Sequence, residues 1–270
     1  MVETVYKIKG APRIALLADL HGRPYDHIIS SLQQHKPSLI CLAGDFIYGS
    51  WPEDDVSPLV SQELILPFFR ACATIAPTYF SLGNHEQMLD DADLAAIRST
   101  GVVVLDNEWR EIEVNGKRAV IGGLTSGYVT DYRAFRGEIN STERYPKKEN
   151  LSGIGGAVTA SQHQPDTAWL KDFAAQPGLK VCMSHHPEYF SLVPGEVELV
   201  ISGHAHGGQI QLYNPFKREW RGVWCPGQGL WPRWTRGVYE GRLVVSAGLA
   251  NTASVPRLFN PTEIVYLERP

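Results

Sequence analysis

The sequence predicts an α/β protein in which two β-sheets stack on each other and helices cover their outer faces. The first half alternates short apolar runs with segments of helical spacing, which is typical of strand–helix units and of a sheet with covered faces. The second half is rich in short strands. Because a chain of 270 residues can bury one large core, we expect a single domain over residues 1–270.

The elements of the first half follow from apolar spacing and from breaker residues. Residues 1–10 alternate polar and apolar side chains, as an edge strand does. Helical spacing indicates one helix that is broken at Pro67 and another that is ended by Gly101. The expected strands are 13–18, 38–42 and 78–82, and the expected helices are 25–35, 56–75 and 90–99.

The second half contains a hairpin signal and two irregular segments. Asn115 and Gly116 separate two apolar runs, which is the strongest short-range signal for a β-hairpin. We expect loop excursions at about 126–164 and 214–235, and loops of this length are uncommon unless they are functional or mobile. The remaining expected elements are strands at 102–105, 111–114, 118–124, 180–184, 198–202, 209–213, 238–239, 243–247 and 263–267, and a helix at 166–175.

Composition narrows the class of protein. The net charge of -4 gives no basic excess, so general nucleic-acid binding is not expected. The four cysteines lie far apart in the sequence, which favours reduced core thiols over disulfides. No signal-peptide pattern opens the chain, and the apolar run at 14–18 is too short to span a bilayer. We expect a cytoplasmic protein, with peripheral contact to membrane lipid left open and the oligomeric state undetermined.

Five of the predicted strands end in residues that can bind metals. In α/β sheets, ligands bind in the crevice outside the carboxyl ends of the strands, so these residues are expected to converge. A mixed set of oxygen and imidazole ligands suits Mn, Fe, Zn or Co better than Mg or Ca. The residues are Asp19 and His21; Asp45; Asn84, His85 and Glu86; His185 and His186; and His204 and His206.

Each of these motifs alone has an ordinary structural explanation. Asn84 and His85 could be turn residues, and His185 could be a hydrogen-bonded core histidine. Five such motifs at strand ends, in order along the chain, have no economical structural explanation. Burying so many ionisable groups together without a metal would be costly. The combination therefore predicts a metal site.

The ordered set D-x-H, G-D, G-N-H-E, H and G-H-x-H, from Asp19 to His206, resembles the calcineurin-like metallophosphoesterase superfamily. The stretch 203–210, the stretch 236–241 and the tail from 244 resemble more closely the YkuE/YaeI-like group of bacterial phosphodiesterases. This resemblance implies a four-layer α/β/β/α sandwich of two mixed β-sheets flanked by helices. It also implies a dinuclear metal centre in the loops above the sheets.

The resemblance also implies a role for each site residue. Asp45 would bridge the two metals, and His85 would bind no metal but face the leaving group as general acid. Because Pro187 follows closely, His185 rather than His186 is expected to bind. Glu86 either orients the imidazole of His85 or is a surface or turn carboxylate. The implied ligands are Asp19, His21 and His206 for the first metal, and Asn84, His185 and His204 for the second.

The activity implied by the resemblance is that of a metal-dependent phosphoric ester hydrolase using two divalent transition-metal ions, Mn, Fe or Zn. Two metals about 3.5–4 Å apart can share a hydroxide that attacks a phosphodiester or pyrophosphate bond of a small substrate. A phosphomonoesterase is the alternative. A non-catalytic binding module on the same fold is less favoured, because Asp45 and His85 are both present. The second Asp and the Arg that follow G-D in the superfamily's protein phosphatases are absent, which argues against that activity.

Two further features leave alternatives open. Arg23 could meet a phosphate oxygen or be a solvated loop residue. The segment 214–235 follows the last metal motif, so we expect it to overhang the site. It could stack on a substrate, contact anionic lipid headgroups through its tryptophans and arginines, or pack as an irregular loop. The segment 126–164 could cap the same pocket or be mobile.

Overall fold

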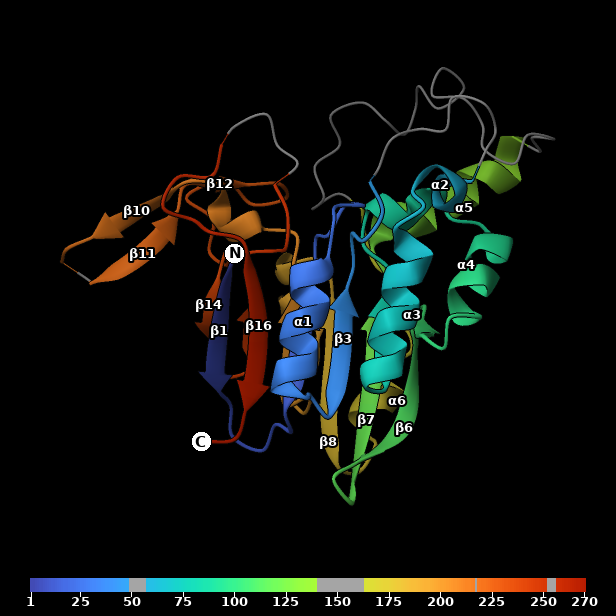
Figure 1. Ribbon diagram of the computed structural model, residues 1–270, viewed down its shortest axis with the longest axis horizontal. Coiled ribbons are helices and arrows are strands. Elements are labelled where there is room, and N and C mark those ends of the chain that lie inside the picture. The colour runs from blue at the N-terminus through green and yellow to red at the C-terminus, as the bar shows by residue number, and fades with distance from the viewer. Residues whose placement is uncertain (49–56, 140–162, 217, 252–255) are drawn as a thin grey trace.

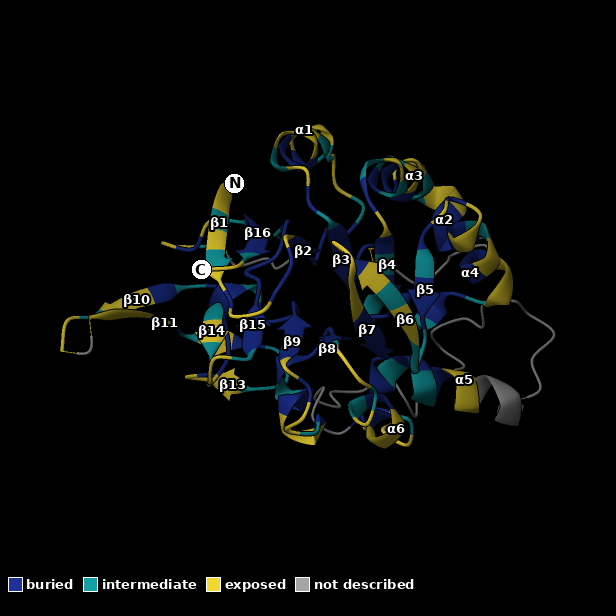
Figure 2. Cartoon of the chain, turned by 90° about the horizontal axis from the view of Figure 1, so that it is seen from below, coloured by how far each residue is buried: buried dark blue, intermediate teal, exposed yellow. Residues whose placement is uncertain are grey.

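The structure is a computed structural model that describes residues 1–48, 57–139, 163–216, 218–251 and 256–270. Two six-stranded sheets lie face to face, and helices cover both outer faces (Figures 1 and 2). This is the predicted α/β/β/α arrangement of two mixed sheets, and the predicted fold class is confirmed.

The first sheet has four adjacent parallel strands. The C-terminal strand and then the N-terminal strand are added at one edge of these four. Its order is β1 (Val2–Lys7), β16 (Glu263–Glu268), β2 (Ile14–Leu17), β3 (Leu39–Ala43), β4 (Thr78–Ser81) and β5 (Val103–Leu105). β2 to β5 are parallel, β16 is antiparallel to β2, and β1 is parallel to β16. α1 (Asp26–His35), α3 (Ile65–Ile75) and α4 (Asp91–Arg98) cover its outer face (Figure 2).

The second sheet also has four adjacent parallel strands, but with one added strand at each edge. Its order is β14 (Gly237–Tyr239), β15 (Leu243–Val245), β9 (Leu199–Ser202), β8 (Leu179–Ser184), β7 (Lys117–Leu124) and β6 (Glu108–Val114). The four central strands are parallel, and the two edge strands are antiparallel to their neighbours. Asn115 and Gly116 join β6 to β7 with positive φ at both residues, which confirms the predicted hairpin.

One of the hydrophobic cores lies between the sheets. Leu16, Cys41, Val181 and Ile201 are fully buried there, or nearly so, in one contiguous cluster. Because both faces of each central strand are covered, these strands are apolar along their whole length instead of alternating. Each fully buried aliphatic side chain contributes about 1.5–3 kcal/mol through its removal from water. This packing fixes the two sheets so that the carboxyl ends of their parallel strands form a common edge.

The predicted helix at 56–75 is two helices. α2 (Pro58–Ser61) begins at the Ser57 cap, whose hydroxyl accepts from the backbone N–H of Leu59, and α3 begins at Ile65. The break comes before Pro67, which lies in the first turn of α3, where a missing N–H costs no helical hydrogen bond. The prediction that Pro67 itself breaks the helix was wrong.

Both predicted loop excursions contain regular structure. The first begins with α5 (Gly127–Ile139), so its first part was wrongly predicted as loop, and residues 140–162 lie outside the described part of the chain. The second contains β11 (Glu219–Gly222) and the hairpin of β12 (Trp224–Cys225) with β13 (Gly229–Leu230). β11 pairs with β10 (Gln211–Asn214), which corresponds to the predicted strand at 209–213. α6 (Leu170–Ala174) is shorter than the predicted helix at 166–175.

Three smaller features concern the first strand, the cysteines and the helices. The first residues form β1 at the edge of the first sheet, as predicted. All four cysteines are buried and free. Among the described residues, no helix is both long and apolar enough to span a membrane.

Candidate metal centre

The predicted ligands follow the carboxyl ends of five strands, three in the first sheet and two in the second. Asp19 and His21 follow β2, Asp45 follows β3, and Asn84 immediately precedes the short helix η1 (His85–Met88) after β4. From the second sheet, His185 follows β8, while His204 and His206 follow β9, with His206 beginning η5 (His206–Gly208). The structure brings all seven residues together at the common edge of the two sheets. Their roles as metal ligands remain predictions.

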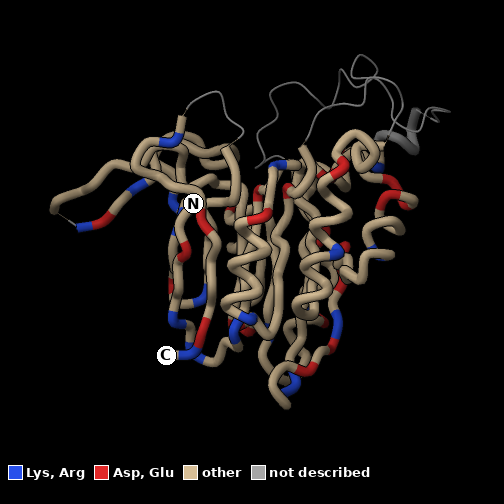
Figure 3. The backbone as a smooth tube through the Cα atoms, viewed as in Figure 1, with Lys and Arg blue, Asp and Glu red and all other residues tan. Residues whose placement is uncertain are grey.

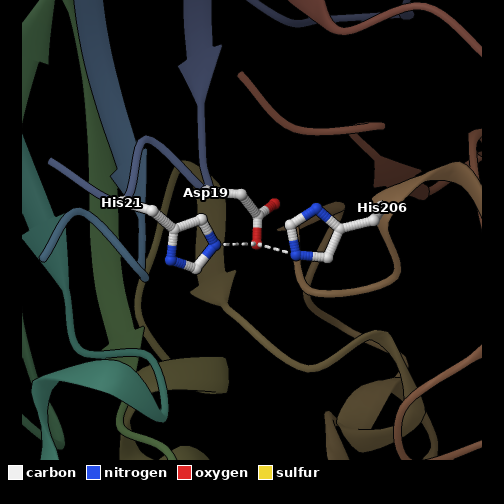
Figure 4. A group of neighbouring side chains, drawn as sticks. All are labelled: Asp19, His21 and His206. Atoms are coloured by element: carbon white, nitrogen blue, oxygen red, sulfur yellow. Dashed lines mark ion pairs between the residues drawn. The ribbon is translucent and has the colours of Figure 1, made fainter. Parts of the chain in front are cut away.

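One part of the cluster is Asp19, His21 and His206, whose potential ligand atoms all lie within 4.8 Å of one another. Oδ1 of Asp19 lies 3.5 Å from Nε2 of His206 and 3.9 Å from Nε2 of His21. Figure 4 shows both rings turned toward this carboxylate from opposite sides. Two imidazole nitrogens and a carboxylate oxygen that face one point can hold one divalent cation.

Asp45 joins this group to a second one. Its carboxylate forms one group with His21 and His85, and another with His185 and His204. Oδ2 of Asp45 lies 3.1 Å from Nε2 of His185 and 3.7 Å from Nε2 of His85. Nε2 of His185 is also 3.9 Å from Oδ1 of Asp19. Asp45 therefore occupies the position between the two halves of the cluster that a bridging carboxylate would need.

The backbone at these residues is strained. Asp19, His21, Asp45, His204 and His206 all have positive φ, between 46° and 64°. Non-glycine residues rarely adopt this left-handed conformation, and it persists only where the surrounding structure enforces it. Five such residues in one cluster indicate that the chain is bent to aim these side chains at a common point.

Close glycines make room for the two carboxylates. A Cβ at Gly83 would lie 2.3 Å from Oδ1 of Asp45, and one at Gly203 would lie 2.7 Å from Oδ2 of Asp19. Each carboxylate is also held by the backbone. Asp45 accepts from the N–H of His85 at 2.9 Å, and Asp19 accepts from the N–H of His204 at 3.2 Å.

Glu86 lies in the turn after β4 but not at the surface, and its role in orienting His85 stays a prediction. It is fully buried, and its carboxylate accepts hydrogen bonds from the backbone N–H groups of Asp45 (2.8 Å), Phe46 (2.8 Å), Ile47 (3.3 Å) and Gly83 (2.7 Å). These donors belong to the turns after β3 and β4. Glu86 therefore ties together the two turns that carry Asp45 and Asn84, an arrangement that spacing in the sequence does not reveal.

Burial and neighbouring charges shift the pKa values across the cluster. Burial raises the pKa of Asp19 and that of Glu86 to about 7 each. Burial also disfavours the charged form of both His185 and Asp45. Their mutual attraction outweighs it, so that the pKa of His185 rises to about 10 while that of Asp45 falls well below its usual value. Burial lowers the pKa of His206 to about 3.

The unsatisfied polar atoms of the cluster fit divalent cations. Within the described part of the chain, Oδ1 of Asn84, both ring nitrogens of His21 and Nε2 of His204 are buried without a hydrogen-bond partner. Buried polar atoms are normally satisfied, so each one needs an explanation. Nδ1 of His185 donates to the carbonyl of Ala43 at 2.7 Å, so the nitrogen that can bind a metal is Nε2, which lies beside Oδ2 of Asp45. The donor set thus suits metals such as Mn, Fe or Zn.

His186 is separate from the Asp45 group. Its Nε2 shares a hydrogen bond of 2.8 Å with the hydroxyl of Ser126, and its Nδ1 lies 3.5 Å from Oε1 of Glu188. His186, Glu188 and His204 form a further group of potential ligand atoms within 4.8 Å of one another. Both carboxylate oxygens of Glu188 are buried without a hydrogen-bond partner among the described residues. Sequence reasoning missed Glu188, although it follows His186 and Pro187 directly.

Arg257 is a second residue that the sequence did not single out. Its guanidinium donates to the carbonyls of Ala247 (2.7 Å) and Ala250 (2.5 Å) and to Nδ1 of His206 (2.9 Å). In this arrangement Nδ1 of His206 is an acceptor, so the ring proton is on Nε2. For Nε2 to bind a metal, the ring proton must move to Nδ1 and Arg257 must release that nitrogen, keeping its carbonyl partners.

A cavity of about 430 Å³ opens over the cluster. His85, Asn84 and His204 line it from the strand ends, and Tyr128 of α5 and Trp224 of β12 line it from the two irregular segments. The expected overhang of segment 214–235 is therefore present at Trp224. Arg23 lines a different, neighbouring hollow together with His21 and Tyr48.

The fold and the site define an α/β protein with a candidate metal centre of aspartate, asparagine and histidine side chains at the strand ends. The chain belongs to the calcineurin-like phosphoesterase family, whose model matches residues 12–208. The matched region contains every predicted ligand from Asp19 to His206. The chain thus carries a calcineurin-like phosphoesterase domain.

Individual relatives are distant. A Caenorhabditis elegans protein that carries the name metallophosphoesterase is 23% identical over 283 residues, which cover 96% of this chain and 48% of the relative. An uncharacterized metallophosphoesterase of Campylobacter jejuni is 24% identical over 264 residues, covering 94% and 56%. The chain therefore spans about half the length of these relatives. Among solved structures, a 5′-nucleotidase precursor from Thermus thermophilus matches with a TM-score of 0.45 and 16% identity, covering 72% of this chain and 42% of that one.

Proposed function

We propose that the chain hydrolyses a phosphodiester or pyrophosphate bond of a small substrate with two divalent transition-metal ions, Mn, Fe or Zn. The observation that carries the proposal is the position of Asp45, whose carboxylate belongs to ligand groups on both sides of the cluster. A carboxylate offers two oxygens and offsets the repulsion between two cations, which makes it the natural bridge.

In this proposal the chain's own residues divide into two sets of ligands. When bound, the ions would supply Lewis acidity toward the phosphoryl oxygens and would activate water for attack. Asn84 adds a neutral oxygen ligand, so the centre keeps its positive charge for the anionic substrate. The proposed ligands are Asp19, His21 and His206 on one side, Asn84, His185 and His204 on the other, and Asp45 between them.

His85 is proposed as the general acid. Its side chain is 26% exposed and lines the cavity, whereas most of the proposed ligands are fully buried. Its backbone N–H donates to Asp45, which holds it at the rim of the centre. An imidazole in this position can give a proton to the departing oxygen of the substrate.

The walls of the cavity favour a diester over a monoester. Tyr48, Tyr128 and Trp224 provide aromatic surface for the two substituents of a diester or a pyrophosphate. None of the described residues that line the cavity is Lys or Arg. A dianionic monoester would gain most from such a cation, whereas a monoanionic diester depends on it less.

Hydrolysis of bis(p-nitrophenyl) phosphate and of p-nitrophenyl phosphate by Mn-loaded protein tests the proposal. We expect higher kcat/KM for the diester and loss of both activities in Asp45→Asn. A preference for the monoester would replace the diesterase proposal with a phosphomonoesterase. No turnover of either compound or of a pyrophosphate, at full metal occupancy, would favour a non-catalytic module.

For location we propose the cytoplasm. The four cysteines are buried and free, which supports a reducing compartment. Fractionation of cells that express the protein at its native level, with a cytoplasmic marker as the control, tests this. Recovery outside the cytoplasmic and peripheral membrane fractions would contradict it.

A further inference from the structure

Exposed aromatic side chains gather on one projecting part of the molecule. The β10–β11 hairpin extends beyond the edge of the two sheets in both views (Figures 1 and 2). Phe216 in its turn is 96% exposed, and Trp220 on β11 is 53% exposed. We call six residues, each at least 45% exposed, the exposed aromatic surface. They are Tyr213, Phe216, Trp220, Trp224, Trp231 and Phe259.

Four residues of the aromatic surface lie together. The ring of Trp220 lies 5.3 Å from that of Tyr213 and 5.9 Å from that of Phe259. Trp220 and Trp231 line the same hollow of about 310 Å³. Trp224, which pairs with the exposed Leu230, also lines the cavity over the candidate metal centre. The surface therefore runs from the tip of the hairpin to the mouth of that cavity.

Basic side chains accompany the aromatic ones, although the whole chain has a net charge of -4. Arg218 and Arg221 are exposed on the hairpin and form no ion pair within the described part of the chain. Arg233 lines the hollow between Trp220 and Trp231 and is paired with Glu240 at 2.9 Å. Glu219 is the acidic residue between the two hairpin arginines. Figure 3 shows the basic positions along the projecting hairpin.

We propose that the exposed aromatic surface docks on a membrane rich in anionic phospholipid. Trp and Tyr have an apolar ring and a polar edge, so they suit the boundary between headgroups and acyl chains. Arginines beside them are attracted to anionic headgroups, each by an amount that corresponds to about fivefold in partitioning. Charge complementarity selects this occupant over an apolar protein surface, which would leave Arg218 and Arg221 unpaired. Docking would turn the mouth of the cavity at Trp224 toward the bilayer.

Vesicle sedimentation with the metal-loaded full chain, freed of excess metal, tests the proposal. We expect binding to vesicles of phosphatidylcholine mixed with phosphatidylglycerol, and much weaker binding to phosphatidylcholine alone. Raising the salt to about 1 M, where the Debye length is about 3 Å, should weaken the electrostatic part. Arg221→Gln should weaken binding about fivefold, and Phe216→Ser about tenfold.

Matched control variants distinguish docking through this surface from non-specific adsorption to vesicles. Arg70→Gln and Leu192→Ser change residues of the same kind that are exposed elsewhere, and both should bind vesicles like the unchanged chain. All four variants should keep activity on soluble bis(p-nitrophenyl) phosphate, because none lies in the candidate centre. Absence of binding to the anionic vesicles, or equal losses in test and control variants, would overturn the proposal. If the chain instead forms a stable dimer that Phe216→Ser dissociates, and binds no vesicles, the surface would be an interface between two copies. That result would also overturn the proposal.

Discussion

Replacing Gly83 by alanine should disable the candidate metal centre without removing any of its ligands. The new Cβ would lie 2.3 Å from Oδ1 of Asp45, 2.7 Å from the backbone nitrogen of Asp45 and 3.0 Å from Oε2 of Glu86. Ordinary contact begins at 3.4 Å, so Asp45 must move by about 1 Å or the turn after β4 must shift. Metal–ligand distances tolerate only about 0.2 Å. A displaced Asp45 would therefore weaken both metal positions together.

The magnitude follows from the overlap. Overpacking of this kind costs about 1–3 kcal/mol of the free energy of unfolding. Loss of a well-placed group around a metal typically costs about 10- to 100-fold in affinity, and a shared ligand should cost at least that at each position. Urea unfolding of the metal-free chain measures the first effect. Competition of Mn or Zn against a chromophoric chelator measures the second.

Gly195→Ala is the matched control. It makes the same chemical change at a glycine where nothing lies within 4 Å of the new Cβ and φ is not positive. Its stability should change by less than about 0.5 kcal/mol, and its metal affinity should not change. If Gly83→Ala bound both metals as tightly as the control does, Asp45 would not be the shared ligand.

Four further predictions concern side chains of the site. His85→Ala should retain both metals and lose about 10²–10⁴-fold in kcat, mainly for substrates with poor leaving groups. Metal analysis and kinetics on a series of leaving groups measure these two effects. Loss of metal from this variant would contradict the general-acid role. Metal binding near neutral pH should release the proton that the raised pKa of about 10 keeps on His185, so affinity should rise with pH toward 10; calorimetry in buffers of different ionisation enthalpy measures the release. In the metal-free chain, the same raised pKa means that the stabilising His185–Asp45 contact is complete below about pH 6.5 and is lost as pH rises through about 10. Glu188→Gln should weaken metal binding about 10- to 100-fold, because a metal-bound histidine usually donates its second ring N–H to a carboxylate, and the buried, unpartnered carboxylate of Glu188 lies in one group with His204. Glu196→Gln, at an exposed glutamate, should bind metal like the unchanged chain. Equal affinity in both variants would exclude this role of Glu188.

Much of the fold could be predicted because its central strands are buried on both faces. Such strands are continuous apolar runs, and each is followed directly by the polar residues of the site. Parallel strands end at the same edge of a sheet, so the convergence of Asp19, Asp45, Asn84, His185 and His204 follows from strand order. Membership of the calcineurin-like family agrees with this reasoning. The finer resemblance to the YkuE/YaeI-like group stays a prediction.

The missed features depend on contacts between distant segments. The role of Glu86 is set by backbone donors about 40 residues earlier in the chain, which no local pattern encodes. Glu188 becomes significant only because β8 and β9 are neighbours and bring His204 beside it. Strand β11 and the β12–β13 hairpin in segment 214–235 were missed because proline, glycine and tryptophan dominate the segment and hide the two-residue period of a strand.

The most direct test of the central claim is anomalous diffraction from crystals of the Mn-loaded protein. The account predicts two manganese peaks at the common edge of the sheets, one beside Asp19, His21 and His206, and the other beside Asn84, His185 and His204. Asp45 should contact both. A single peak, peaks elsewhere in the molecule, or none under saturating Mn would contradict a two-metal centre at this site.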